Sequence, residues 1–133
     1  MSKNVLERAV EVGLRDRDIF DWPNVEGAFN KVKEEIEELD EVLKSQNQTK
    51  IFEEFSDVFF TLLQVARHQK IDPEKNLDFA LKKYNLRYHK MFQLIEEEKK
   101  QIEKLNLGEL ELFWQKAKKE SHDELQKILA SYL

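Results

Sequence analysis

The sequence predicts an all-α protein built from a few long helices, and three observations support this prediction. Only three glycines and two prolines occur in 133 residues, which leaves little material for turns. Apolar residues recur at the three- and four-residue spacing of a buried helix face. The composition, 41% apolar and 37% charged, is that of a globular but unusually charged chain. We therefore expect one domain covering residues 1–133, with an antiparallel helical hairpin at its core.

Composition also limits the function classes. The absence of cysteine removes disulfides, thiolate metal sites and thiol nucleophiles, and it fits a reducing cytoplasm. The formal charge of −5 argues against general affinity for nucleic acid, which depends on Lys and Arg neutralising phosphates. No apolar run approaches the roughly 20 residues that span a bilayer, and the N-terminus lacks a signal-peptide pattern. We expect a cytoplasmic protein that binds neither membrane nor nucleic acid.

The first half of the chain predicts a short helix followed by a helical hairpin. The short helix has Ser2 as its N-cap and Gly13 as its stop. The Asp-Trp-Pro-Asn run at 21–24 is a turn that leads into a helix from Val25 to Lys44. The polar run SQNQT then forms the tip of the hairpin, and the next helix begins near Thr49 and extends to His68. In the helix from Val25 to Lys44, the expected buried stripe is the apolar row Val32, Ile36, Leu39 and Leu43.

The second half predicts one long helix and two shorter ones. Asp72 followed by Pro73 is a strong start signal, with Asp as N-cap and Pro in the first helical position. We expect this helix to continue through the charged run EEEKKQIEKL as an exposed extension. Two capping-box signatures then open the last helices: Asn106 with Glu109, and Ser121 with Glu124.

Acidic residues are concentrated on both helices of the predicted hairpin. Six carboxylates lie between positions 34 and 41, and among them Glu35 and Glu38 share one helix face beside the apolar row. Glu54 and Asp57 form a second pair three residues apart, in a helix that is otherwise mostly apolar. An antiparallel hairpin brings the two pairs opposite each other, and a hard divalent cation removes their repulsion. Oxygen ligands alone favour Mg²⁺ or Mn²⁺. The alternative is a solvated acidic face, with Asp57 paired or capped.

A carboxylate-bridged di-iron bundle is excluded by the histidines. Such bundles use Glu-x-x-His on two helices. The residues three positions before the histidines are Val65 for His68, Leu86 for His89 and Lys119 for His122. Since none of these is Glu, the motif does not occur.

Basic and aromatic residues further along the chain suggest a phosphate-bearing ligand. Lys83 and Arg87 are one helical turn apart, and a cation held by acids opposite such bases is the arrangement expected for a polyphosphate. The alternative is a solvated basic stripe. Trp114 and Trp22 either stack on a base or belong to the core.

Three ordered blocks resemble a known family. They are EExxE at 34–38, ExxD at 54–57, and the run ARHQKIDPEKNLDFALKKYNLRY. In this order they resemble the all-α nucleoside triphosphate pyrophosphohydrolases of the MazG type, over residues 20–118. The similarity is greatest to the C-terminal domain of two-domain bacterial MazG proteins. The resemblance implies a MazG-like helical bundle, completed by dimerisation, that hydrolyses a nucleoside triphosphate to the monophosphate and pyrophosphate with Mg²⁺.

The resemblance also implies roles for individual residues. Its metal ligands, and with them the catalytic centre, correspond to four carboxylates: Glu35, Glu38, Glu54 and Asp57. Lys31, Lys83 and Arg87 fall at basic positions that contact phosphates, and Trp114 falls at a nucleotide-binding position. We expect Glu34 beside the nucleotide, where it would orient water or an outer-shell ligand.

A different class of function is also compatible with the sequence. A non-catalytic helical dimer would keep the same scaffold and either sense nucleotides or bind another protein. In both cases we expect a homodimer or a higher homo-oligomer. The helix from Ile51 to His68 is apolar on most of its faces, which is more than three neighbours in one small chain readily cover.

Overall fold

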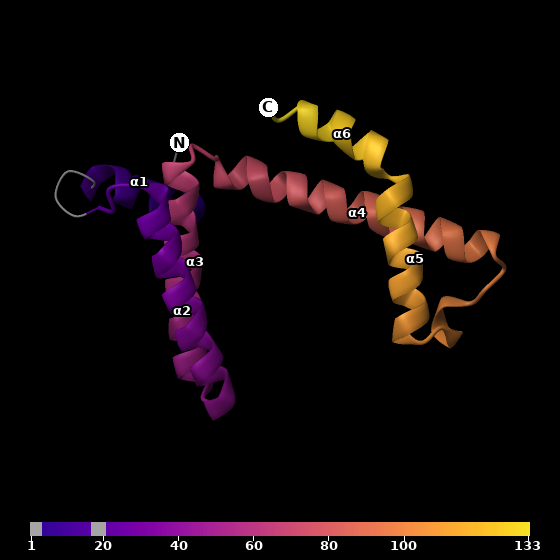
Figure 1. The fold of residues 1–133 in the computed structure, drawn as a ribbon, viewed down its shortest axis with the longest axis horizontal. Coiled ribbons are helices and arrows are strands. Elements are labelled where there is room, and N and C mark those ends of the chain that lie inside the picture. The colour runs from indigo at the N-terminus through magenta and orange to yellow at the C-terminus, as the bar shows by residue number, and fades with distance from the viewer. Residues whose placement is uncertain (1–3, 17–20) are drawn as a thin grey trace. The chain divides into compact units, whose positions relative to one another are not determined.

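The computed structural model describes residues 4–16 and 21–133, and these residues confirm the all-α prediction (Figure 1). Within the described part of the chain there are six α-helices, one short 3₁₀ helix and no strand. None of the described helices is both long and apolar enough to cross a bilayer. The chain divides into two compact units, Met1–Glu74 and Lys75–Leu133. The prediction of a single domain over residues 1–133 stays a prediction.

The first unit is built on the predicted antiparallel hairpin, in which α2 (Val25–Ser45) and α3 (Gln48–His68) lie side by side (Figure 1). Only two residues separate them, so the predicted five-residue tip was too long. The cause is the Asn47 side chain, which accepts a hydrogen bond from the Lys50 N–H at 3.2 Å and starts α3 earlier. At the other end, Asn24 caps α2 by accepting from the Gly27 N–H at 3.0 Å.

The seam between α2 and α3 differs from the predicted apolar stripe. The buried residues of α2 are Ala28, Val32 and Glu35, spaced four and three apart. In contrast, the Ile36 and Leu43 side chains of the predicted stripe are 49% and 52% exposed. The stripe was therefore half wrong, because the hairpin turns α2 so that a carboxylate takes an apolar position in the seam.

The first helix, α1 (Val5–Asp16), packs on α3. Asn4 caps it by accepting from the Glu7 N–H at 2.8 Å, while the predicted N-cap Ser2 lies outside the described residues. Gly13 was predicted to end this helix, but it lies inside it. A Cβ atom at Gly13 would collide with the side chains of Gln64 and Arg67, so glycine here allows two helices to approach closely.

An ion pair fastens the chain before α2 to the end of α3. The Arg67 guanidinium donates to both carboxylate oxygens of Asp21, at 2.7 and 3.1 Å, and the His68 ring lies 3.3 Å from one of them. The Trp22 N–H also donates to this carboxylate at 2.8 Å. The hydrogen bond with Arg67 is the largest cause of the low pKa of Asp21, which falls from 3.8 to about 2. This contact fixes the open end of the hairpin.

The second unit contains most of α4 (Pro73–Glu97), the 3₁₀ helix (Ile102–Lys104), α5 (Leu107–Glu120) and α6 (His122–Ala130). In Figure 1, α5 crosses the second half of α4. The core lies at this crossing and consists of five buried residues: Met91, Leu94, Ile95, Phe113 and Ala117. The predicted capping box of Asn106 and Glu109 is confirmed, since both reciprocal hydrogen bonds are present.

Two predictions for this unit were wrong. The charged run after Glu97 does not extend α4, because the chain turns at Lys99 and brings Ile102 and Leu105 against the core. Ser121 does not cap α6 through its side chain. Its hydroxyl donates instead to the Ala117 carbonyl at 2.6 Å, which leaves it in the last turn of α5.

We predict that Asp21→Asn destabilises the protein by about 1.5–3 kcal/mol near neutral pH, because it removes a charged acceptor from a half-buried arginine. The folded pKa near 2 lies below the unfolded value of 3.8. The stabilisation is therefore complete above about pH 4 and disappears as pH falls toward 2. Urea unfolding followed by circular dichroism at several pH values measures both effects.

Asp40→Asn is the matched control, because the Asp40 side chain is 70% exposed and its only described partner, Lys44, lies 3.8 Å away. It should change stability by less than about 0.5 kcal/mol. Equal effects of the two substitutions, or a difference that does not shrink in acid, would contradict the assignment.

Candidate functional site

Three of the predicted carboxylates converge across the hairpin. Glu35 and Glu38 come from one face of α2 and Glu54 comes from α3, and one oxygen of each lies within 4.8 Å of the others. The short tip sets this register, since it places the middle of α2 opposite the first half of α3. Asp57 is exposed one turn further along α3 and is not part of this group of three.

Burial makes this cluster different from an ordinary acidic surface. Glu35 is only 7% exposed, and the Oε2 atoms of Glu35 and Glu54 are buried without a hydrogen-bond partner in the described residues. A buried charged oxygen without a partner is costly, by several kcal/mol for an isolated ion. Carboxylate oxygens that converge in this way are suitable ligands for a hard divalent cation such as Mg²⁺ or Mn²⁺. The donor set therefore fits the predicted metal.

The pKa of Glu54 is raised by its burial and by its position among the other carboxylates. Burial is the main cause that raises the pKa of Glu54, and the charges of Glu38, Asp57 and Glu35 raise it further, in that order. Asp57 thus acts on this site although it lies outside the group of three. Ionisation of Glu54 is therefore less favourable than that of an isolated glutamate.

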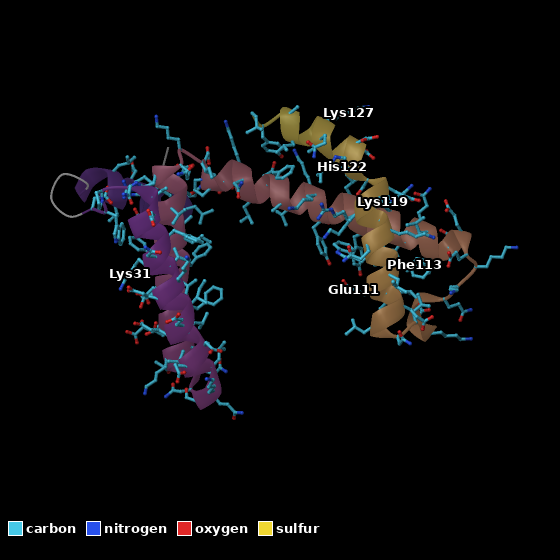
Figure 2. The ribbon with its side chains drawn as sticks, viewed as in Figure 1. Lys31, Glu111, Phe113, Lys119, His122 and Lys127 are labelled. Carbon is cyan, nitrogen blue, oxygen red and sulfur yellow. The ribbon has the colours of Figure 1, made fainter. Side chains whose placement is uncertain are left out.

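Lys31 lies one turn before Glu35 on α2 (Figure 2). Its Nζ atom is 3.2 Å from Glu34 Oε2 and 3.3 Å from Glu35 Oε1. The hydrogen bonds with Glu34 and Glu35, in that order, raise the pKa of Lys31 above 10.5. This pairing was not predicted for Lys31, which was expected beside phosphate, although the three- and four-residue spacing of Lys and Glu was a signal for it.

The other predicted residues lie in the second unit. The Lys83 ammonium is 5.7 Å from the centre of the Phe79 ring. The Nε atom of Arg87 is buried and has no hydrogen-bond partner in the described part of the chain. Trp114 is half-buried against the core of this unit, and its ring centre is 5.7 Å from that of Tyr84. The predicted position of these residues opposite the carboxylates stays a prediction.

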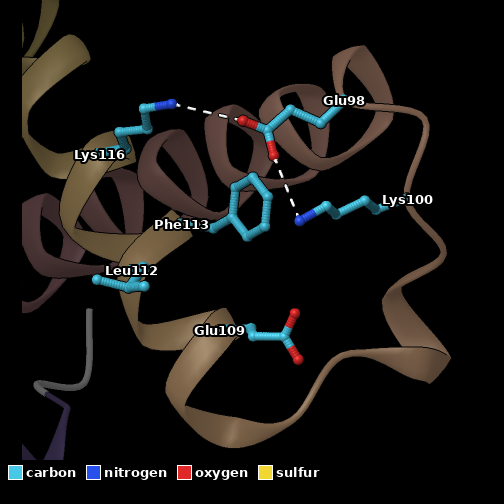
Figure 3. Close-up of a pocket in the computed structure, with 6 residues that line it drawn as sticks. All are labelled: Glu98, Lys100, Glu109, Leu112, Phe113 and Lys116. Atoms are coloured by element: carbon cyan, nitrogen blue, oxygen red, sulfur yellow. Dashed lines mark ion pairs between the residues drawn. The ribbon is translucent and has the colours of Figure 1, made fainter.

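A pocket in the second unit offers no competing site (Figure 3). Glu98 pairs with Lys116 at 3.6 Å and with Lys100 at 3.8 Å, and the Lys100 ammonium lies 5.8 Å from the Phe113 ring centre. The carboxylate of Glu109 accepts from the Asn106 N–H. Glu98, Lys100 and Lys116 are thus paired with one another, and Glu109 is held by the N-cap of α5.

Known proteins are similar in sequence to the region that contains the hairpin. Residues 25–92 match the MazG nucleotide pyrophosphohydrolase domain, which is half of the chain. The chain belongs to the MazG family. It is 35% identical over 118 residues to the nucleoside triphosphate pyrophosphohydrolase/pyrophosphatase MazG of Thermotoga maritima, covering 89% of this chain and 43% of that protein.

Two further relatives are similar to parts of this chain. The nucleoside triphosphate pyrophosphohydrolase of Escherichia coli is 27% identical over 121 residues, which are 89% of this chain and 46% of that protein. The uncharacterized protein YabN of Bacillus subtilis is 32% identical over 65 residues, 49% of this chain and 13% of that protein. The chain thus spans less than half the length of the curated relatives it matches. The family match contains every candidate site residue except Trp114.

We predict that Glu54→Gln raises the melting temperature of the metal-free protein at about pH 7.5. The folded pKa of Glu54 is raised above the unfolded value of 4.5. Between these two pKa values the folded protein therefore binds more protons than the unfolded chain. Ionised Glu54 therefore lowers stability as pH rises, and the gain from Gln should vanish below about pH 4.5. Calorimetry in a chelator measures it, with the exposed neighbour Glu53→Gln as control. An unchanged or lower melting temperature would contradict the crowding of this cluster.

Proposed function

We propose that this chain is a nucleotide pyrophosphohydrolase, which hydrolyses nucleoside triphosphates to the monophosphate and pyrophosphate with Mg²⁺, or with Mn²⁺ in its place. The supporting observation is the convergence of Glu35, Glu38 and Glu54, with two buried unpartnered oxygens, in a member of the MazG family. The printed names of the Thermotoga and Escherichia relatives describe the same activity for those proteins.

The four predicted carboxylates would hold the cation. Glu35 and Glu54 lie in or beside the hairpin seam, where packing limits their movement, whereas Glu38 and Asp57 are exposed and able to adjust. When bound, a divalent cation neutralises phosphate charge and activates water for attack on a phosphoanhydride. A side-chain nucleophile is not needed for this reaction. The four acids provide the negative charge that makes cation binding favourable at neutral pH.

The basic residues and Trp114 would bind the nucleotide. An ammonium group has three N–H donors, so Lys31 retains one for phosphate while it pairs with Glu34 and Glu35. Arg87 has a buried Nε donor without a partner, and an arginine fork suits phosphate oxygens. Lys83 supplies a further charge. Trp114, beside Tyr84, offers an aromatic surface for a base, and Glu34 remains a candidate for orienting water.

The proposal includes a homodimer, or a higher homo-oligomer, formed through the hairpin. On α3 the exposed residues Phe52, Phe55, Phe59 and Leu62 follow a three- and four-residue spacing. On α2 the half-exposed residues Phe29, Ile36 and Leu43 are seven apart. At about 100° per residue, both stripes are displaced from the seam by about a quarter turn in the same sense. In an antiparallel pair this puts them on one face, which a second hairpin would cover as a four-helix bundle.

We predict that the purified protein releases pyrophosphate from nucleoside triphosphates when Mg²⁺ is present and not in a chelator. Glu38→Gln and Asp57→Asn should each lower the rate by more than about 100-fold, because loss of a ligand exceeds the effect of losing an outer partner. Circular dichroism should show both variants folded. A panel of nucleoside triphosphates, with detection of pyrophosphate, is the measurement.

Glu37→Gln and Asp40→Asn are the matched controls, since both are exposed acids of α2 outside the convergent group. They should keep the wild-type rate. Unchanged Mg²⁺-dependent turnover in Glu38→Gln or Asp57→Asn would remove that residue from the site. Nucleotide binding without pyrophosphate release would favour the non-catalytic sensor instead.

We predict that light scattering gives a mass at least twice the 16.0 kDa of one chain. Phe55→Glu should lower this mass, because it puts a charge into the apolar stripe of α3. Leu107→Glu is the control, since it puts the same charge at a residue that is 82% exposed in the first turn of α5 and does not belong to this stripe. A wild-type monomer would contradict the proposed dimer.

A further inference from the structure

The two oxygens of the Glu35 carboxylate have different surroundings. Oε1 lies 3.3 Å from the Lys31 ammonium, while Oε2 is buried and has no hydrogen-bond partner in the described residues. The side chain as a whole is 9% exposed. One oxygen is therefore compensated by a protein cation, and the other is held ready for a ligand that the protein does not provide.

We propose that Lys31 is a positioning residue for the cation site, which fixes the Glu35 carboxylate so that only Oε2 is presented to the metal. The inference rests on the proposed function, because it assigns a role toward the cation which that function requires. Outer partners of metal ligands commonly act in this way, by orienting the ligand and tuning its basicity. Lys31 itself does not bind the metal.

The geometry around Lys31 suits a fixed orientation. Its Nζ atom bridges Glu34 at 3.2 Å and Glu35 at 3.3 Å. These two residues lie three and four positions after Lys31, in the next turn of the helix. Glu34 is 63% exposed and is free of the seam, so it holds the ammonium from the solvent side. The ammonium then meets Glu35 from one direction only, which leaves the buried oxygen untouched.

A simple charge effect predicts the opposite result, which makes the inference testable. If Lys31 acted only as a nearby positive charge, it would repel a divalent cation, and removing it would strengthen cation binding. If Lys31 holds Glu35 in its binding orientation, removing it weakens binding, because the carboxylate turns to satisfy itself elsewhere. The two explanations therefore differ in the sign of the change.

The experiment is a Mg²⁺ titration of the nucleotide-free protein by calorimetry. We expect Lys31→Gln to weaken Mg²⁺ binding by roughly 10–100-fold, and Lys31→Arg to restore part of it because it keeps a donor near Glu35. Lys33→Gln is the matched control, with the same loss of charge on the same helix. The Lys33 ammonium lies 4.8 Å from the Phe29 ring centre and takes no part in the cluster. It should bind Mg²⁺ as tightly as wild type, or more tightly.

A Lys31→Gln variant that binds Mg²⁺ as well as Lys33→Gln would overturn the inference while leaving the proposed function intact. A wild-type protein that binds no divalent cation would overturn the proposed function instead. A double-mutant cycle of melting temperatures, measured without metal, tests the pairing of Lys31 with Glu35 directly. Lys31→Gln should lower the melting temperature by roughly 3–6 °C in the wild-type background and much less in Glu35→Gln, and equal effects in both backgrounds would refute the pairing.

Discussion

The structure depends on two carboxylates placed where a helical hairpin normally puts apolar side chains. Glu35 follows Ala28 and Val32 in the buried row of α2, and Glu54 lies opposite it on α3. Each has one buried oxygen without a partner. Replacing buried charges by well-packed apolar groups is often neutral or stabilising, so these acids are not explained by the stability of the hairpin. The hairpin therefore carries a local instability that a bound cation would relieve.

Without a cation, the negative charge of each acid is compensated in a different way. Glu35 is balanced by Lys31, while the raised pKa of Glu54 makes a proton easier to keep. Glu38 and Asp57 remain exposed to water. Helix caps at both ends of the hairpin and the Asp21 contact with Arg67 hold the backbone in register, so the repulsion is relieved only by side-chain movement of the exposed Glu38 and Asp57. Under the proposed function, a bound cation would remove the repulsion that remains.

Much of this could be predicted from the sequence, and the errors have physical causes. The helix types followed from the three- and four-residue spacing and from the turn signals around Pro23 and Pro73, and so did the convergence of Glu35, Glu38 and Glu54. The buried face of α2 could not be read correctly, because Ile36 and Glu35 are neighbours and the apolar one was the natural choice. The contact between Asp21 and Arg67 joins residues 46 positions apart, so no local spacing indicates it. Gly13 looked like a helix stop, since its reason lies in the approach of another helix.

The positions of the acids also explain how one small hairpin accommodates two surfaces. At about 100° per residue, Glu38 and Asp57 lie about a quarter turn from the seam in one sense, whereas the stripe with Phe55 and Phe59 lies about a quarter turn in the other. The acids and the apolar stripe therefore occupy opposite faces of the helix pair. A second hairpin that covers the stripe would leave the acidic face open to solvent, so that nucleotide and cation could enter an assembled protein. In the proposed dimer, assembly and ligand binding would use different faces of α3, which would reconcile its apolar stripe with Glu54 and Asp57.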